Sequence, residues 1–286
     1  MKPTKEQFFN AVTEIESFSP APAILASAMR ILNNPHSDIQ SIAALVGRDS
    51  ALTADIIRCA NSAYYGGLIS RSISEAVQKI GMSETLRLLN LAVARVVSSR
   101  DLGCYAIQGA NYWAESLFNG LFMQALSKLT GEGDPDEAYT AGLLRYIGRL
   151  AIDHAIENLQ GALFWDGKSP LAQWELDNVG LVQAQAGGML LRKWRFSDSM
   201  VNAIEGQDEP TKLETANWMA EALHFSSGLL PQGVGVPFNS AQVPTFAITP
   251  SSDEFMSRHE LSRPEVEELL QTTSQSFDAI RKNFGG

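Results

Sequence analysis

The sequence predicts an all-α protein, and three observations support this class. Helix-start signals recur along the chain, glycine or proline stops follow them, and no run of alternating apolar and polar residues makes a convincing β-strand. Between the starts and stops, apolar residues recur at the spacing of one helix face. The chain is therefore expected to contain about a dozen helices.

The start signals are capping boxes. In each box a Ser or Thr hydroxyl accepts a hydrogen bond from a free backbone N–H, and a Glu or Gln three residues later bonds back to the cap. Asp134 followed by Pro135 marks a further start, because proline at the first helical position loses no hydrogen bond. The boxes are Thr4/Gln7, Ser37/Gln40, Ser72/Glu75 and Ser262/Glu265. The stops are Asn33-Asn34-Pro35, Gly47, Gly66-Gly67, Gly81 and Gly131.

In chain order, the sequence is expected to form four units: an N-terminal helix within 1–16, a bundle of short helices over 17–100, a second helical bundle over 101–227, and a tail over 228–286. The tail begins with a Gly/Pro-rich stretch, 228–252, which is expected to be a loop containing one candidate extended segment, VPTFAI. A last amphipathic helix is predicted near 263–283. Its apolar face should be buried against the same chain or a second copy, and comprises Val266, Leu269, Leu270, Phe277 and Ile280.

Composition narrows the function classes. Hydrophobic residues make up 45% of the 286 residues, which is enough for a large core. The formal net charge is −10, and an acidic chain repels a phosphate backbone, so a nucleic acid is not the expected partner unless the cations gather on one face. The sequence has neither the layout of a signal peptide nor a stretch of about 18 apolar residues, which predicts a cytoplasmic protein without a membrane association. Cys59 and Cys104 are expected to be buried thiols.

Three stretches resemble the first part of the HDOD family. They are FSPAPAILASAMRILNNP, SIAALVGRDSALTADIIRCANSAYYGG and SISEAVQKIGMSETLRLLNLAV, and AGLLRYIGRL follows at 141–150. The resemblance covers about residues 17–207. HDOD domains are bacterial all-helical signalling domains related in fold to HD-type metal-dependent phosphohydrolases. The resemblance thus implies two packed helical bundles forming one HDOD unit, the second a degenerate HD-like bundle.

The resemblance also implies that the metal ligands of an HD site are lost. The corresponding positions are occupied by Glu115, Arg145, Tyr146, Gln183 and Gln207, with Asp208 beside the last. A divalent metal needs imidazole nitrogens or anionic oxygens, whereas arginine is always protonated and glutamine offers a neutral amide. No metal, no cofactor and no catalytic residue are therefore expected. Instead, the Arg145 guanidinium is expected to replace the metal as the central cation, held by Glu115.

Two further stretches are candidate partner or ligand surfaces. One is NSAYYG, with Asn61, Ser62, Tyr64 and Tyr65, and the other is RKWR, with Arg192 and Arg195. The tyrosines combine apolar rings with hydroxyls that need partners, and arginine can clamp a phosphate. Both stretches also have structural explanations, as a packed turn between helices and as cations near a helix C-terminus.

The expected function is a non-enzymatic signal-transduction module that binds a signalling protein partner or a small regulatory ligand, with a phosphate-bearing molecule as one candidate. Two alternatives remain open. One is a residual metal-dependent phosphohydrolase of the HD type, and the other is a receptor for a cyclic dinucleotide.

Overall fold

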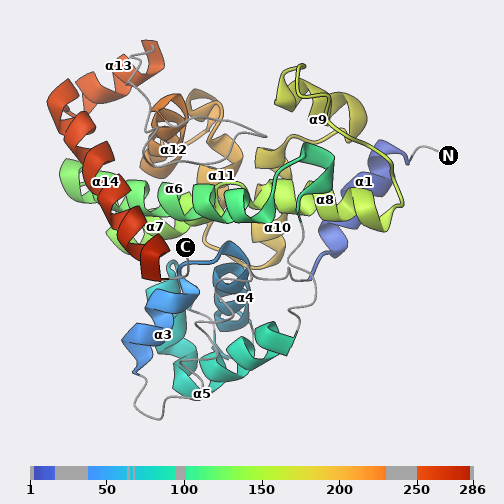
Figure 1. Cartoon of the computed structure of the whole chain (residues 1–286), viewed down its shortest axis with the longest axis horizontal. Coiled ribbons are helices and arrows are strands. Elements are labelled where there is room, and N and C mark those ends of the chain that lie inside the picture. Colours follow the sequence, from blue (N-terminus) through green and yellow to red (C-terminus); the bar gives the residue numbers. More distant parts are fainter. Residues whose placement is uncertain are drawn as a thin grey trace.

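A computed structural model describes residues 3–16, 38–62, 65–66, 68–94, 101–229 and 250–283, and every regular element in these ranges is a helix (Figure 1). The only β-type pairing there is an isolated bridge between Leu102 and Ile107. The predicted all-α class is confirmed. In the described ranges, no helix combines the length and the apolarity needed to cross a membrane.

The helices form two groups, and the first lies below the long central helices in Figure 1. It consists of α3 (Ile39–Val46), α4 (Ser50–Ala60) and α5 (Ile73–Ala94). The second group contains α6 (Gly109–Thr130), α7 (Pro135–Leu144), α8 (Ile147–Asn158), α9 (Leu171–Asn178), α10 (Gln183–Lys193), α11 (Asp198–Gly206) and α12 (Trp218–Leu229). Of the 3₁₀ turns in the described residues, η3 (Gly103–Tyr105) precedes α6, and η4 (Pro210–Lys212) lies between α11 and α12.

The terminal helices complete the second group. The N-terminal helix α1 (Lys5–Glu14) buries Phe8 and Val12 and packs against α8 and α10. At the other end, α13 (Pro250–Arg258) packs on α12, and α14 (Arg263–Asn283) crosses α6. The helices α1 and α14 are thus attached to the later helices rather than to the α3–α5 group.

Several predicted helix boundaries are observed. Thr4 and Gln7 form a reciprocal capping box at α1, as do Ser262 and Glu265 at α14. Gly131 ends α6 in the left-handed conformation, with φ 71°. The Asp134 carboxylate caps α7, with Pro135 in its first turn.

Other boundaries differ from the prediction. The cap of α3 is Asp38 rather than Ser37, because the Asp38 carboxylate accepts from the backbone N–H of Ser41; Ser37 lies outside the described residues. Gly81, by contrast, does interrupt the helix as predicted: its φ of 77° and ψ of 173° are non-helical, and α5 consists of two helical segments joined by a kink at this residue. The helix α13 was not predicted, since Pro250 to Arg258 was assigned partly to the loop. The candidate strand VPTFAI lies outside the described residues.

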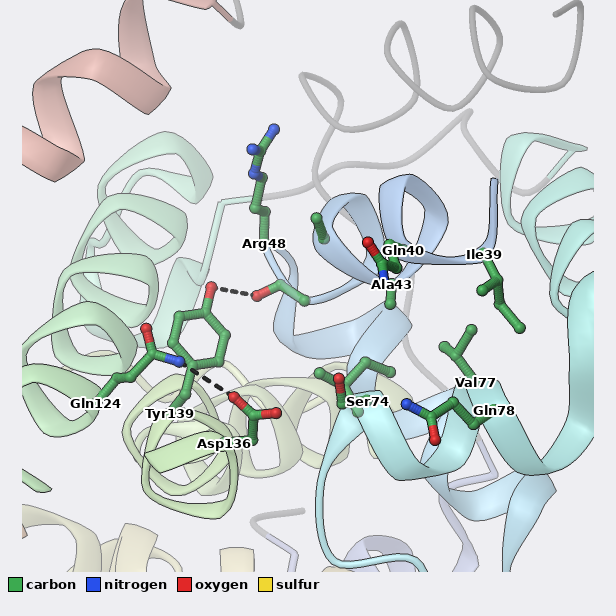
Figure 2. A pocket seen from close by; sticks show the side chains of 13 residues that line it. Ile39, Gln40, Ala43, Arg48, Ser74, Val77, Gln78, Gln124, Asp136 and Tyr139 are labelled. Carbon is green, nitrogen blue, oxygen red and sulfur yellow. Dashed lines mark hydrogen bonds between the residues drawn. The ribbon is translucent and has the colours of Figure 1, made fainter. Parts of the chain in front are cut away.

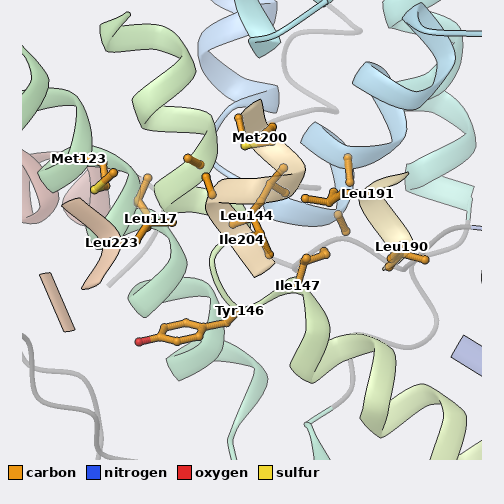
Figure 3. Close-up of a cluster of buried hydrophobic side chains, with 14 of the residues drawn as sticks. Leu117, Met123, Leu144, Tyr146, Ile147, Leu190, Leu191, Met200, Ile204 and Leu223 are labelled. Atoms are coloured by element: carbon orange, nitrogen blue, oxygen red, sulfur yellow. The ribbon is translucent and has the colours of Figure 1, made fainter. Parts of the chain in front are cut away.

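The core of the second group is built around α6, α7, α10 and α11 (Figure 3). Its buried side chains include Leu117, Leu144, Ile147, Leu191 and Ile204, all essentially inaccessible to solvent. Burial of such aliphatic side chains stabilises the folded state by roughly 1.5–3 kcal/mol each. This packing fixes the direction of the α7–α8 segment, which contains the residues resembling the HD site.

The predicted apolar face of α14 is buried on the same chain. Val266, Leu269, Leu270 and Phe277 are all less than a tenth exposed. The Phe277 ring packs edge-to-face against Phe118 of α6, with ring centroids 5.8 Å apart. The side chain of Ile280 lies outside the described residues.

Candidate functional site

The candidate site is the part of the second bundle where the HD metal ligands would lie. Glu115 belongs to α6, Arg145 and Tyr146 join α7 to α8, Gln183 begins α10, and Gln207 follows α11. All five side chains are buried, and their exposed fractions range from 1% to 8%. Residues up to 92 positions apart in the sequence therefore meet in one region of the fold.

Two glycines of AGLLRYIGRL create this region. A Cβ atom on Gly142 would lie 2.3 Å from the carbonyl oxygen of Asn119 on α6, and one on Gly148 would lie 1.8 Å from that of Gln183 on α10. Any side chain at either position would collide with backbone that cannot move away. The glycines let α7 and α8 approach these helices closely, which brings Gln183 up to the start of α8.

Arg145 is buried but is not paired with Glu115, so the expected ion pair is wrong. Its Nη1 atom donates to Asn119 Oδ1 at 3.1 Å and to the hydroxyl of Ser226 on α12. Arg145 is the C-cap of α7, and the chain turns at Tyr146, with φ −104° and ψ 18°, before α8 starts. This break sends Arg145 towards α6 and α12.

The cation facing Glu115 is Arg149, four residues further along. Its Nη1 atom lies 3.7 Å from Glu115 Oε2, and both side chains are at most 10% exposed. The Arg149 guanidinium also lies over the ring of Tyr146, with its Cζ atom 3.9 Å from the ring centroid, and Arg145 Cζ is 5.0 Å from the same centroid. Tyr146 thus lies next to both guanidinium groups as an apolar, π-rich neighbour.

Burial controls the ionisation of Glu115. It raises the pKa of the carboxyl group to about 7, although the positive charges of Arg149 and Arg145 oppose the shift. The carboxylate also lacks the close, charge-assisted hydrogen bonds that would lower its pKa, since 3.7 Å exceeds hydrogen-bonding distance. Glu115 and Arg149 therefore form a buried, loosely paired couple.

A second buried carboxylate, Glu175 on α9, was not identified from the sequence. It accepts a hydrogen bond from the Tyr105 hydroxyl at 2.8 Å and another from the backbone N–H of Gln183 at 2.8 Å. Burial raises its pKa, while these two donors and the charge of Arg149 lower it. In the sequence, Glu175 lies within WELDN, where it resembles any residue of a solvated helix face.

Gln183 and Gln207 keep the region polar. The Gln207 amide nitrogen donates to the backbone carbonyl of Arg145 at 3.1 Å, which ties the end of α11 to the α7–α8 turn. The side-chain oxygens of both glutamines are buried and accept no hydrogen bond from the described residues. Asp208, by contrast, is exposed.

These donors do not suit the divalent cation of an HD site. Within the described ranges, no three His, Cys, Asp or Glu side chains are grouped closely enough to hold a metal ion. Glu115 faces the Arg149 guanidinium, and Arg145 places a second permanently charged guanidinium among the buried HD-site positions. A divalent cation would meet electrostatic repulsion there, because arginine cannot release its proton at any workable pH.

The two other candidate stretches meet at one contact. The Asn61 amide donates to the backbone carbonyl of Arg195 at 2.8 Å and exchanges hydrogen bonds with the backbone of Ser70. Asn61 is 5% exposed, so it serves as a packed joint between α4 and the end of α10. Ser62 and Tyr65 are half-buried, and Tyr64 lies outside the described residues.

The RKWR stretch lies at the C-terminal end of α10, where Arg192 is in the last turn of the helix. Arg192 forms two hydrogen bonds to the Glu205 carboxylate, at 2.9 and 2.8 Å, so a phosphate would have to displace Glu205. Trp194 is 2% exposed and packs inward. Arg195 is exposed and adopts a left-handed backbone, with φ 60°.

Comparison with known proteins agrees with this architecture. A relative from Treponema pallidum (strain Nichols), described as an uncharacterized protein, is 26% identical over 196 residues, and the match covers 66% of this chain and 37% of the relative. The chain thus spans little more than a third of that protein's length.

Two solved structures are similar in fold. The MmoQ response regulator from Methylococcus capsulatus str. Bath matches with a TM-score of 0.69 and 23% identity, over 89% of this chain and 98% of its own. A virulence factor (cj0248) from Campylobacter jejuni subsp. jejuni matches with a TM-score of 0.72 and 18% identity, over 95% and 97% of the two chains. The HDOD domain model matches residues 19–210, more than half of the sequence, and on this ground the chain belongs to the HDOD domain family.

Proposed function

We propose that this chain is a non-enzymatic signal-transduction module that acts by binding a protein partner or a small regulatory ligand. The supporting observation is the position of Arg149, whose guanidinium lies 3.7 Å from Glu115 within the group of HD-site positions. A guanidinium has no lone pair for a metal and cannot lower the pKa of a bound water as a divalent ion does.

The pKa of Glu115 is the one feature that favours catalysis, because general bases often have pKa values near 7. Here burial accounts for the shift, and the groups around the carboxyl are an arginine pair and the ring of Tyr146. General-base catalysis contributes roughly 10²–10⁴-fold, which is small beside what hydrolysis of a phosphate ester requires. A buried structural ion pair is the simpler account of Glu115.

On this proposal the signal passes through contacts with other molecules, in the cytoplasm. A signalling protein is the favoured partner, and a small phosphate-bearing ligand is the second. The net charge of −10 disfavours nucleic acid. Of the candidate surface residues, Ser62, Tyr65 and Arg195 keep some exposure, whereas Asn61 and Arg192 are engaged within the chain.

The test is a hydrolysis assay on the full chain with phosphomonoesters, phosphodiesters and nucleotides, in the presence of added manganese or magnesium. The expected rate equals that of buffer with the same metal. Steady metal-dependent turnover that Glu115→Gln abolishes would instead establish a residual phosphohydrolase. A rise in melting temperature with a cyclic dinucleotide would favour the receptor alternative, because a ligand that binds only the folded state stabilises it.

A further inference from the structure

A groove opens between the two helical groups, and its lining does not include the Glu115–Arg149 pair. Figure 2 shows it between α3 and α5 of the first group and α6 and α7 of the second. Its volume is about 410 Å³, which lies within the range of sites for small ligands or inserted side chains. An occupant would touch both groups at once and would therefore be sensitive to how they are arranged.

The floor of the groove is aliphatic. Val77 and Ile73 of α5 are buried beneath it, and Ile39 and Ala43 of α3 form a half-buried wall. Such a surface favours an aliphatic side chain, whose burial removes apolar area from water on both partners.

The rim provides amide groups. Gln40 of α3 and Gln78 of α5 are exposed, and neither side chain has a hydrogen-bonding partner in the described part of the chain. Ser74 adds a half-buried hydroxyl between them. A glutamine amide can both donate and accept, which is what the N–H and C=O groups of a peptide backbone require.

The charge at the rim favours a cationic group. Asp136 of α7 accepts one hydrogen bond, from the Gln124 amide at 3.3 Å, and forms no ion pair with the described residues. The cation of the lining, Arg48, already has interactions within the chain. A lysine or arginine of an occupant would therefore find an available carboxylate.

The same lining disfavours a nucleotide. Tyr139 is the aromatic residue of the lining, and its ring packs against Gly120 and Gly47, where added Cβ atoms would lie 3.2 and 3.6 Å from ring carbons. Its hydroxyl is also engaged, because it donates to the Gly47 carbonyl at 2.5 Å. A base would lack a free ring to stack on, and a phosphate would meet Asp136.

We propose that this groove binds a short peptide segment of a partner protein. One aliphatic side chain lies on Val77 and Ile73, the peptide backbone bonds to Gln40 and Gln78, and a neighbouring Lys or Arg pairs with Asp136. This proposal rests on the proposed function, in that it names the partner class of a non-enzymatic module.

The test is a selection of short random peptides displayed on phage against the full chain, followed by titration of the selected peptides. Enriched peptides should share an aliphatic residue close to a Lys or Arg. Ala44→Trp, at an exposed lining position on α3, should fill the groove and abolish binding. Asp136→Asn should weaken binding roughly threefold to fivefold, as expected for an exposed ion pair.

Asp177→Asn provides the matched control. Asp177 is exposed on α9 and also accepts a hydrogen bond from a glutamine, Gln173, but lies outside the groove. Its substitution should leave peptide affinity unchanged. The absence of enriched peptides, or equal binding to Ala44→Trp, would overturn the groove proposal. Hydrolysis assays on the same preparations distinguish the two failures. Metal-dependent turnover would contradict the proposed non-enzymatic function, whereas a lack of peptide binding without turnover would contradict the groove proposal alone.

Discussion

Arg149 of α8 faces Glu115 of α6 across 3.7 Å, and both side chains are almost fully buried. The carboxylate and the guanidinium are too far apart for a direct hydrogen bond, yet among the described residues this is the one ion pair that either group forms. The energetic effect of this pair can be measured as a change in the free energy of unfolding, and this measurement needs no ligand.

The first prediction concerns pH. The pKa of Glu115 is about 7 in the folded chain, against an ordinary value of 4.5. The folded state therefore holds this proton more tightly than the unfolded state, and stability falls as the pH rises from about 4.5 to about 7. Relative to Glu115→Gln, the parent protein should lose about 2–3 kcal/mol of unfolding free energy between about pH 5 and about pH 8.

Urea denaturation at the two pH values measures this difference. Glu137 and Glu175, whose pKa values burial also raises, are present in both proteins and cancel in the comparison. Glu6→Gln removes the same charge from an exposed position and is the matched control. Parallel pH curves for the parent and Glu115→Gln would show that the carboxyl group is not desolvated as described.

The second prediction concerns which arginine couples to Glu115. Arg149→Met combined with Glu115→Gln should cost less than the sum of the single changes, with a coupling free energy of roughly 0.5–3 kcal/mol. Arg145→Met combined with Glu115→Gln should be closer to additive, because Arg145 bonds to Asn119 and Ser226 instead. A double-mutant cycle at pH 8, where Glu115 is ionised, measures both couplings. A larger coupling for Arg145 would contradict the observed pairing.

The third prediction concerns the close contact of α8 with α10. Gly148→Ala would place a Cβ atom 1.8 Å from the carbonyl oxygen of Gln183, so the helices must separate. Alanine normally favours a helix over glycine, yet here the unfolding free energy should fall by about 3 kcal/mol or more. Gly103→Ala is the control, since a Cβ there meets nothing within 4 Å. Equal stabilities of the two variants in urea would argue against tight packing at Gly148.

The fourth prediction concerns the C-terminal helix. Phe277 is fully buried against Phe118, and Phe277→Ala should cost about 3–5 kcal/mol. Phe164→Ala removes the same ring from a position that is 68% exposed and should cost far less. Thermal or urea unfolding provides the comparison. If Phe277→Ala were as mild as Phe164→Ala, α14 would not be docked on α6 in solution.

The sequence by itself determined the helical class and several helix ends, because these depend on neighbours within one turn. The Thr4 box, the Ser262 box and Gly131 behave as local chemistry dictates. Gly81 likewise interrupts the helical geometry of α5. The α3 start shows the limit of such signals, since a neighbouring Asp can take over a cap. The grouping of the HD-site positions was also accessible, through resemblance.

Only the tertiary structure decided which charges meet. Arg145 and Arg149 lie four residues apart, a spacing that on a continuous helix would place them on one face, but the break at Tyr146 separates them. The partners of Arg145 are distant in sequence: Asn119 lies 26 residues away and Ser226 lies 81 residues away. Glu175 joins the site through its hydrogen bond from the backbone N–H of Gln183, at the start of α10. No local pattern marks them, because a buried polar residue is distinguished from a solvated one by what packs over it. Both arginines of AGLLRYIGRL can be read from the sequence, but only the packing of α6, α8 and α12 decides that Glu115 pairs with Arg149 and not with Arg145.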